Sequence, residues 1–161
     1  MRTYKVVPLD SKCGIIEFCQ GTVSLKELLC GTDLVSGLHA REEPGDMKAL
    51  QVRTNLKDAA RTQVNEASRM FREACAVFKP VFRHFFYEQH STVQSWTQAI
   101  ANYRRSLAQW SIVTYVVGLG DRHLSNVLFE MDTCKLVHID LGEISVYARF
   151  NFRLCPKIRV F

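Results

Sequence analysis

The sequence lacks several patterns that would define a function class directly. Its six cysteines are scattered and form no C-x-x-C pair, so a zinc site with the usual four-ligand spacing is not expected. No apolar run reaches the roughly 18 residues that a membrane-spanning helix needs, and no secretory apolar segment follows Met1. The sequence therefore predicts no membrane association and reduced thiols in a nuclear or cytosolic protein.

An excess of charge of one sign is also missing from most of the chain. The formal net charge is +5, but residues 148–161 contain four basic residues and no acidic one. The remaining 17 of the 21 basic residues balance the 16 acidic residues. A basic surface for nucleic acid would have to be assembled by the fold, so direct nucleic-acid binding is not expected.

Short runs of β-branched and aromatic residues predict strands near both ends of the chain. Residues 3–9 and 13–19 flank the polar turn "DSK" and are expected to form a hairpin or two adjacent strands. A second hairpin is expected from 127–130 and 135–139, joined by the turn "MDTC". Both hairpins are expected to belong to small antiparallel sheets.

Apolar residues recur at helical spacing through the middle of the chain. The predicted segments are a short helix over 24–30, a Gly-rich and charged loop over 31–46, one long helix over 55–78 before Pro80, and two helices around 96–103 and 107–116. Gly118 and Gly120 are expected to stop the last helix. The order of the predicted elements, strands followed by helices and then a small hairpin, predicts an α+β fold.

The stretch "LGDRHLSN", residues 119–126, combines an Asp, a His and an Asn, and "LVHIDLG", residues 136–142, adds a carboxylate after a strand. Asn126 and Asp140, together with phosphate oxygens, would suit Mg²⁺, which prefers oxygen ligands. Asp121 would then accept a proton from an acceptor hydroxyl, and His123 would place a donor near the transferring group. The pattern favours phosphoryl transfer.

Plain structural roles are the alternative. Asp121 could cap a turn, Asn126 could open a strand and Asp140 could end one. A single loop or strand histidine such as His123 or His138 is more often a satisfied polar residue than a catalyst. The spacing of the carboxylates and the Asn favours the functional reading.

The motif segments "GLGDRHLSNVLFE" and "LVHIDLG" resemble the catalytic loop and metal-binding segment of the phosphatidylinositol 3-kinase-related protein kinases. In that family the order is G-D-R-H-x-x-N, in place of the H-R-D of other protein kinases. The segments "RTYKVVPL", "GIIEFCQGTV" and "FKPVFRHFFYE" resemble one member of the family, a kinase of DNA-damage signalling, more than the others. The likeness extends from Met1 to about Gly142.

The resemblance implies a bilobal, protein-kinase-like catalytic domain that uses ATP with Mg²⁺ or Mn²⁺. Asp121 matches the catalytic base, His123 the histidine near the γ-phosphate, and Asn126 and Asp140 the metal ligands. The remaining matched positions are those of adenine binding, with Glu17, Phe18 and Cys19 in the hinge and Leu128 and Ile139 under the base. From the residues alone, Phe18, Leu128 and Ile139 would more simply be core residues.

Two departures from the family pattern lead us to expect a truncated catalytic domain. No G-x-G-x-x-G occurs in the chain, and the phosphate-bridging lysine would precede Met1. After "HIDLG", the stretch "EISVYARFNFRLCPKIRVF" replaces the family's activation segment. We therefore expect a remnant of the small lobe with the hinge over 1–20, the large lobe over 21–142, and a divergent, loosely ordered tail over 143–161.

Two functions follow as alternatives. The first is part of a nuclear serine/threonine kinase that phosphorylates Ser or Thr before Gln in DNA-damage signalling, with protein substrates and a DNA-damage sensor complex as partners. The second is a catalytically inactive product or an interaction module on a kinase large lobe. A phosphoinositide kinase shares the loop order but is disfavoured by the hinge stretch, and small-molecule kinases are disfavoured by the hinge and the helical insert.

Overall fold

The computed structural model describes residues 1–141 except 11–12, 33–35, 47–48 and 63. These residues form two compact units. Of the described residues, one unit contains Met1–Leu25 together with 90–141, and the other contains Lys26–Gln89. The predicted tail over 143–161 lies outside the described residues, and the predicted lobe boundaries remain a prediction.

A three-stranded antiparallel sheet forms the centre of the first unit. Its order is β3 (Thr22–Ser24), β4 (Val127–Glu130) and β5 (Leu136–His138). The fully buried side chains of this unit come from the last two strands and the turn between them, and they are Phe129, Cys134, Leu136 and Val137. The β4–β5 hairpin was predicted from the sequence, and the structure confirms it.

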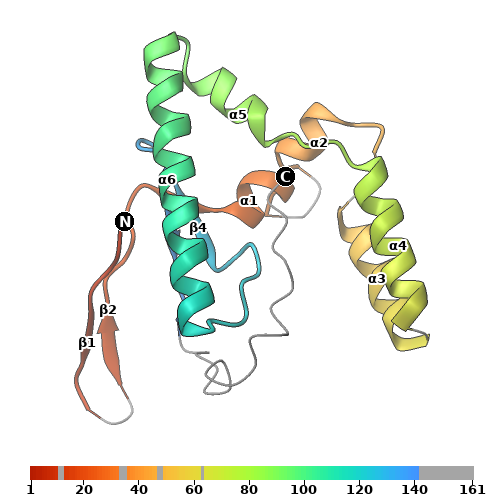
Figure 1. Ribbon diagram of the computed structural model, residues 1–161, viewed down its shortest axis with the longest axis horizontal. Helices are drawn as coiled ribbons and strands as arrows, with labels where there is room; N and C mark the ends of the chain where they lie inside the picture. The colour runs from red at the N-terminus through yellow and green to blue at the C-terminus, as the bar shows by residue number, and fades with distance from the viewer. Residues whose placement is uncertain (11–12, 33–35, 47–48, 63, 142–161) are drawn as a thin grey trace. The chain divides into compact units, whose positions relative to one another are not determined.

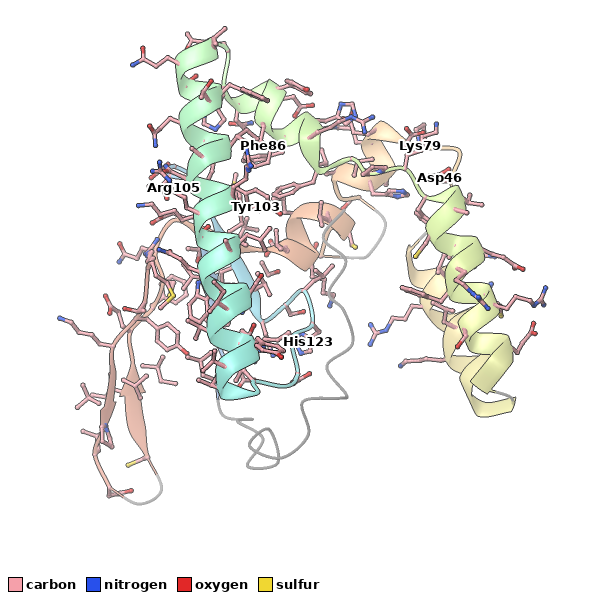
Figure 2. The ribbon with its side chains drawn as sticks, in the orientation of Figure 1. Asp46, Lys79, Phe86, Tyr103, Arg105 and His123 are labelled. Atoms are coloured by element: carbon pink, nitrogen blue, oxygen red, sulfur yellow. The ribbon has the colours of Figure 1, made fainter. Side chains whose placement is uncertain are left out.

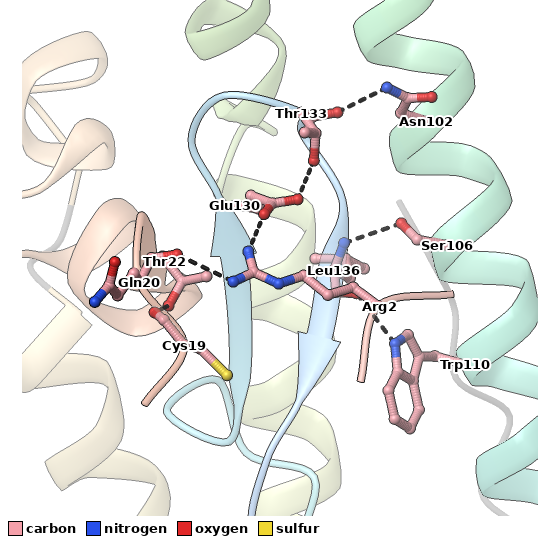
Figure 3. Close-up of polar contacts among 10 residues, drawn as sticks. All are labelled: Arg2, Cys19, Gln20, Thr22, Asn102, Ser106, Trp110, Glu130, Thr133 and Leu136. Carbon is pink, nitrogen blue, oxygen red and sulfur yellow. Dashed lines mark hydrogen bonds and ion pairs between the residues drawn. The ribbon is translucent and has the colours of Figure 1, made fainter. Parts of the chain in front are cut away.

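Helix α6 (Val93–Val117) packs against β5. The helix buries Ala99, Ser106, Trp110 and Thr114, which recur at intervals of seven and four residues and so share one face. Two side chains on this face bond the main chain of Leu136: the Trp110 indole donates to its carbonyl at 3.1 Å, and the Ser106 hydroxyl accepts from its amide at 3.0 Å (Figure 3). The long helix therefore fixes the position of β5.

The prediction of two separate helices in this region is wrong. Residues 93–117 contain neither Gly nor Pro, so nothing in the backbone interrupts the hydrogen-bond ladder. The helix begins after Thr92, whose hydroxyl accepts from the Ser95 amide, and ends at Gly118 in the left-handed region with φ 61°. The predicted stop at Gly118 is confirmed.

The first hairpin is also confirmed, with shorter strands than predicted. β1 (Val6–Pro8) pairs antiparallel with β2 (Gly14–Ile16), and Val6 lies opposite Ile16. All six strand residues are exposed. The hairpin therefore presents apolar side chains on the surface of its unit.

The second unit is helical, and its elements differ from the predicted ones in two places. A short helix, α2 (Leu38–Glu42), lies inside the predicted loop, and α5 (Phe82–Gln89) follows Pro80. The predicted long helix is instead two helices, α3 (Ala49–Thr62) and α4 (Val64–Val77), which lie side by side (Figure 1). The physical reason is packing, because two amphipathic helices can cover each other's apolar faces.

Ion pairs and ring contacts hold the short helices of this unit together. Arg41 of α2 binds Glu88 of α5 at 2.6 Å, and the His39 ring lies 4.9 Å from the Phe78 ring. α1 (Leu25–Cys30), predicted over 24–30, is confirmed. In the part of the chain that the structure describes, no helix is long and apolar enough to cross a membrane.

Candidate active site

The candidate catalytic loop begins directly where α6 ends. The Leu119 amide donates to the Thr114 carbonyl at 2.9 Å, and Leu119 is buried, so the first residue of the loop is anchored to the helix. Asp121 follows with φ 46°, in the left-handed region, which Asp tolerates better than most residues because of its short polar side chain. This turn leaves the Asp121 side chain about half exposed, at 47%.

Asn126 closes the loop from the other side. It is 6% exposed, and its side-chain amide donates to the Asp121 carbonyl at 3.0 Å and lies 3.5 Å from the carboxylate oxygen Oδ2. Its backbone amide donates to the His123 carbonyl at 2.9 Å. Because Nδ2 is engaged with Asp121, the side-chain oxygen of Asn126 is left as an acceptor.

The His123 side chain stands in the same loop, as Figure 2 shows. Its Nε2 lies 3.8 Å from Oδ2 of Asp121, and its side chain is 55% exposed. An exposed pair at this distance adds little stability, because water screens the attraction. The loop therefore keeps both groups accessible and does not use them to stabilise the fold.

Asp140 reaches the loop through the end of β5. The Ile139 amide donates to the Asn126 carbonyl at 3.0 Å, which continues the hairpin pairing up to the residue before Asp140. Asp140 then turns out of the sheet with φ 54° and is exposed. The structure thus brings Asp121, His123, Asn126 and Asp140 together at one end of the β4–β5 hairpin.

Arg122 joins the two segments, a role that sequence reasoning missed although the residue lies inside the motif. Its guanidinium donates to the carbonyls of Gly120 at 2.7 Å, Ile139 at 2.8 Å and Asp140 at 2.5 Å. Five donors in a rigid plane allow one arginine to hold several carbonyls at once. The sequence gives no sign of these partners, because two of them are contributed by a different strand end.

His138 lies buried beneath the same segments. Its ring stacks on Trp110 with centroids 4.5 Å apart and 8° between the planes. Burial, and then the charge of Arg122, lower its pKa from 6.5 to about 4. His138 is therefore neutral at neutral pH and supports β5 by packing.

The residues that the resemblance assigns to the hinge, 17–19, lie just past β2 in the same unit. The Gln20 amide donates to the Phe18 carbonyl at 3.0 Å, and the Thr22 hydroxyl donates to the Cys19 carbonyl at 2.6 Å, so the chain turns sharply here. The Phe18 residue is 83% exposed, which excludes the core role that its residue type suggested. Cys19 is buried, and the Glu17 carboxylate accepts from the Lys5 amide at 2.9 Å.

Tyr4 connects this turn with the Asp140 segment, and sequence reasoning missed it as well. Burial, and then the neighbouring Cys19, raise the pKa of its hydroxyl, while a backbone hydrogen bond from Asp140 opposes the shift. Tyr4 therefore lies close to both Cys19 and Asp140. Leu128 of β4 and Ile139 after β5 are half-buried, as residues that line an open surface would be.

The side chains at this end of the hairpin could bind a divalent metal ion and accept a proton. The Asp140 carboxylate and the Asn126 amide oxygen are hard oxygen donors, which fit Mg²⁺ or Mn²⁺ when phosphate oxygens and water complete the shell. Asp121 is exposed enough to reach a hydroxyl outside the loop. Among the described residues, no cluster of three His, Cys, Asp or Glu side chains could hold a metal without such partners.

Residues 1–153 match the family model of phosphatidylinositol 3- and 4-kinases. The chain therefore belongs to this family, as its motifs predicted. It is 51% identical to "Serine/threonine-protein kinase ATM" of Caenorhabditis elegans over 149 residues, which are 92% of this chain and 6% of that relative. It is 40% identical to "Serine-protein kinase ATM" of Sus scrofa, over 87% of this chain and 4% of that relative.

Solved structures agree with the sequence comparison. The structure entitled "FAT and kinase domain of CtTel1" matches with a TM-score of 0.79 and 39% identity over 88% of this chain and 10% of that one. The α+β, kinase-like fold is therefore confirmed. The chain spans about one twentieth of the length of the curated relatives, so what those whole proteins do is not shown for this chain.

Proposed function

We propose that the chain carries the catalytic loop and metal-binding segment of a serine/threonine protein kinase that transfers the γ-phosphate of ATP to Ser or Thr. The observation that supports this most is the meeting of the Asp121 loop and the Asp140 segment at one end of the β4–β5 hairpin. Hydrogen bonds from Arg122 and Ile139 join the two segments. The names of the matched relatives support the same activity.

Each residue has a role in this proposal. Asp121 accepts the proton of the acceptor hydroxyl, and His123 beside it donates toward the transferring phosphoryl group. Asn126 and Asp140 hold the metal ion, Mg²⁺ or Mn²⁺, through their side-chain oxygens. A divalent ion in this position would neutralise phosphate charge during transfer.

The adenine would bind beside the turn after β2. The backbone carbonyl of Glu17 and the backbone amide of Cys19 would bond the base, and the exposed Phe18 ring would lie against it. Leu128 and Ile139 would form the apolar floor, consistent with their partial burial. Tyr4, between Cys19 and Asp140, links the base end of the site to its metal end.

The names of the matched relatives also suggest a substrate type, a pathway and a partner. We infer that the substrates are proteins phosphorylated at Ser or Thr before Gln, in nuclear DNA-damage signalling with a damage-sensor complex as partner. The matched relatives carry the names ATM and Tel1, and the quoted hinge and helical stretches resemble theirs.

An inactive interaction module is the second candidate, and one observation favours it. Four apolar side chains of the first hairpin, Val6, Val7, Ile15 and Ile16, are more than half exposed. An apolar surface of this kind suits contact with protein. In this alternative the nucleotide site residues are retained without function.

Calorimetry separates the two candidates. ATP is titrated into the 161-residue chain with and without Mg²⁺, for wild type, Asp140→Asn and Asp132→Asn. Asp132 is an exposed carboxylate in the β4–β5 turn and serves as the matched control. We expect binding that Mg²⁺ strengthens in wild type and in the control, and a loss of that Mg²⁺ effect in Asp140→Asn.

Asp121→Asn tests the assignment of the base. This variant should keep Mg²⁺-dependent ATP binding, because Asp121 is not assigned to the metal. In a kinase that also contains the phosphate loop and its lysine, the same substitution should abolish phosphoryl transfer. The kinase proposal predicts these opposite responses of two carboxylates. Absence of any ATP binding in folded wild-type chain would instead leave the interaction module as the function.

A further inference from the structure

Arg122 makes contacts that the proposed catalytic roles do not use. Its three hydrogen bonds go to backbone carbonyls, one in the catalytic loop at Gly120 and two in the other segment at Ile139 and Asp140. Gly120 immediately precedes Asp121, and Asp140 is itself the proposed metal ligand. One side chain therefore spans the two segments that must act on the same nucleotide.

Each of the two segments that Arg122 joins contains an aspartate in a backbone conformation that most residues avoid. Asp121 has φ 46° and Asp140 has φ 54°, both in the left-handed region. Non-glycine residues persist there only when the surrounding structure holds them. The Arg122 bond to Gly120 closes the turn around Asp121, and its bond to the Asp140 carbonyl fixes the peptide that follows the second strained residue.

We propose that Arg122 is a positioning residue that holds the Asp140 segment against the catalytic loop, so that the metal ligands Asn126 and Asp140 stay in register. This proposal rests on the kinase function proposed above. A second contact acts in the same direction, because the Ile139 amide donates to the Asn126 carbonyl at 3.0 Å. Arg122 donates to the carbonyl of that same Ile139 at 2.8 Å. Both the backbone N–H and the backbone C=O of Ile139 are therefore hydrogen-bonded to the catalytic loop segment.

The geometry requires arginine and not merely a positive charge. The guanidinium presents its Nε and two terminal nitrogens in one plane, and each nitrogen donates to a different carbonyl. A lysine ammonium is a single point on a flexible stem and cannot span carbonyls from two segments in the same way. Arg122→Lys therefore keeps the charge and removes the bridge, whereas Arg122→Met removes both.

Two measurements on the chain test the proposal. The first is amide hydrogen exchange of Asn126 and Ile139, followed by NMR without nucleotide. The second is Mn²⁺ binding in the presence of ATP, followed by electron paramagnetic resonance. Arg105→Met is the control, because Arg105 is an exposed arginine on α6 of the same unit (Figure 2).

We expect both Arg122 variants to exchange the two amides at least about tenfold faster than wild type, because the loss of even one hydrogen bond from a charged donor has about this effect. We also expect Mn²⁺ affinity to fall about tenfold, with ATP binding in the absence of metal unchanged. Arg105→Met should match wild type in both measurements. Near-UV circular dichroism like that of wild type would show that the variants are folded.

The outcomes separate this proposal from the function on which it rests. Wild-type exchange rates and Mn²⁺ affinity in folded Arg122→Met would overturn the positioning role while leaving the kinase site intact. Wild-type behaviour of Arg122→Lys with a defect in Arg122→Met would overturn the bridging geometry and leave charge as the cause. If wild type binds no Mn²⁺ with ATP, the kinase function fails, and the exchange rates still decide whether Arg122 joins the two segments.

Discussion

The Sγ of Cys134 lies 3.2 Å from Nε2 of His90, and this contact ties the β4–β5 turn to the start of α6. The Cys134 side chain is fully buried, and burial raises its pKa from 9.0 to about 11. The thiol is therefore protonated at neutral pH, and it hydrogen-bonds the His90 ring. Cys134 also has φ 60°, so the turn holds this residue in a strained conformation around a hydrogen bond.

The raised pKa of Cys134 predicts a loss of stability at alkaline pH. Between pH 9 and 11 the unfolded chain releases the thiol proton while the folded chain retains it, so the free energy of unfolding falls as pH rises. Two pH units correspond to up to about 3 kcal/mol. Urea unfolding of wild type and Cys134→Ala at pH 8 to 11 measures the effect, and the variant should show the shallower decline.

Cys13→Ala is the control for this experiment. Cys13 is an exposed thiol in the same unit, so its removal should leave the pH dependence of stability as in wild type. A decline that is equally steep in Cys134→Ala and wild type would show that the buried thiol is not responsible.

A second prediction concerns the contact between α6 and β5. Trp110→Phe removes the indole donor and leaves the Leu136 carbonyl buried without that partner. We expect a loss of about 1 to 3 kcal/mol in the free energy of unfolding, measured by urea denaturation. Ser111→Ala is the matched control, since its hydroxyl bonds the Leu107 carbonyl of its own helix. Equal stability of Trp110→Phe and Ser111→Ala would contradict this role of the indole.

The parts of the fold that local pattern decides could be predicted from the sequence. The β4–β5 hairpin follows from two apolar runs around a polar turn. The end of α6 follows from Gly118, because glycine adopts the positive φ of a helix C-terminus without a steric cost. Family membership followed from the motif loop and is confirmed. The roles of the individual site residues stay predictions.

The parts that depend on distant partners could not be predicted. β3 is only three residues long and forms because β4 offers it an edge. The pattern over 55–78 is helical throughout, and only packing of α3 on α4 makes two helices of it. Arg122 and Tyr4 were missed for the same reason, because their partners at 139–140 are remote in the sequence.

A final prediction concerns a polar network that joins the chain start to the sheet. Arg2 binds the Glu130 carboxylate and the Gln20 carbonyl, and Thr133 donates to the same carboxylate (Figure 3). The Glu130 side chain is only 15% exposed, so its charge depends on these partners. Glu130→Ala should therefore lower the free energy of unfolding by about 1 to 3 kcal/mol in urea denaturation.

A double-mutant cycle of Arg2→Ala with Glu130→Ala isolates the pair itself. The same cycle on Arg69 and Glu73, an exposed pair one helical turn apart on α4, is the comparison. Burial weakens screening by water and salt, so the coupling between Arg2 and Glu130 should exceed that of the exposed pair and survive added salt better. Equal coupling in the two cycles would mean that the network contributes no more than a surface contact, and that the start of the chain is held to the sheet by other interactions.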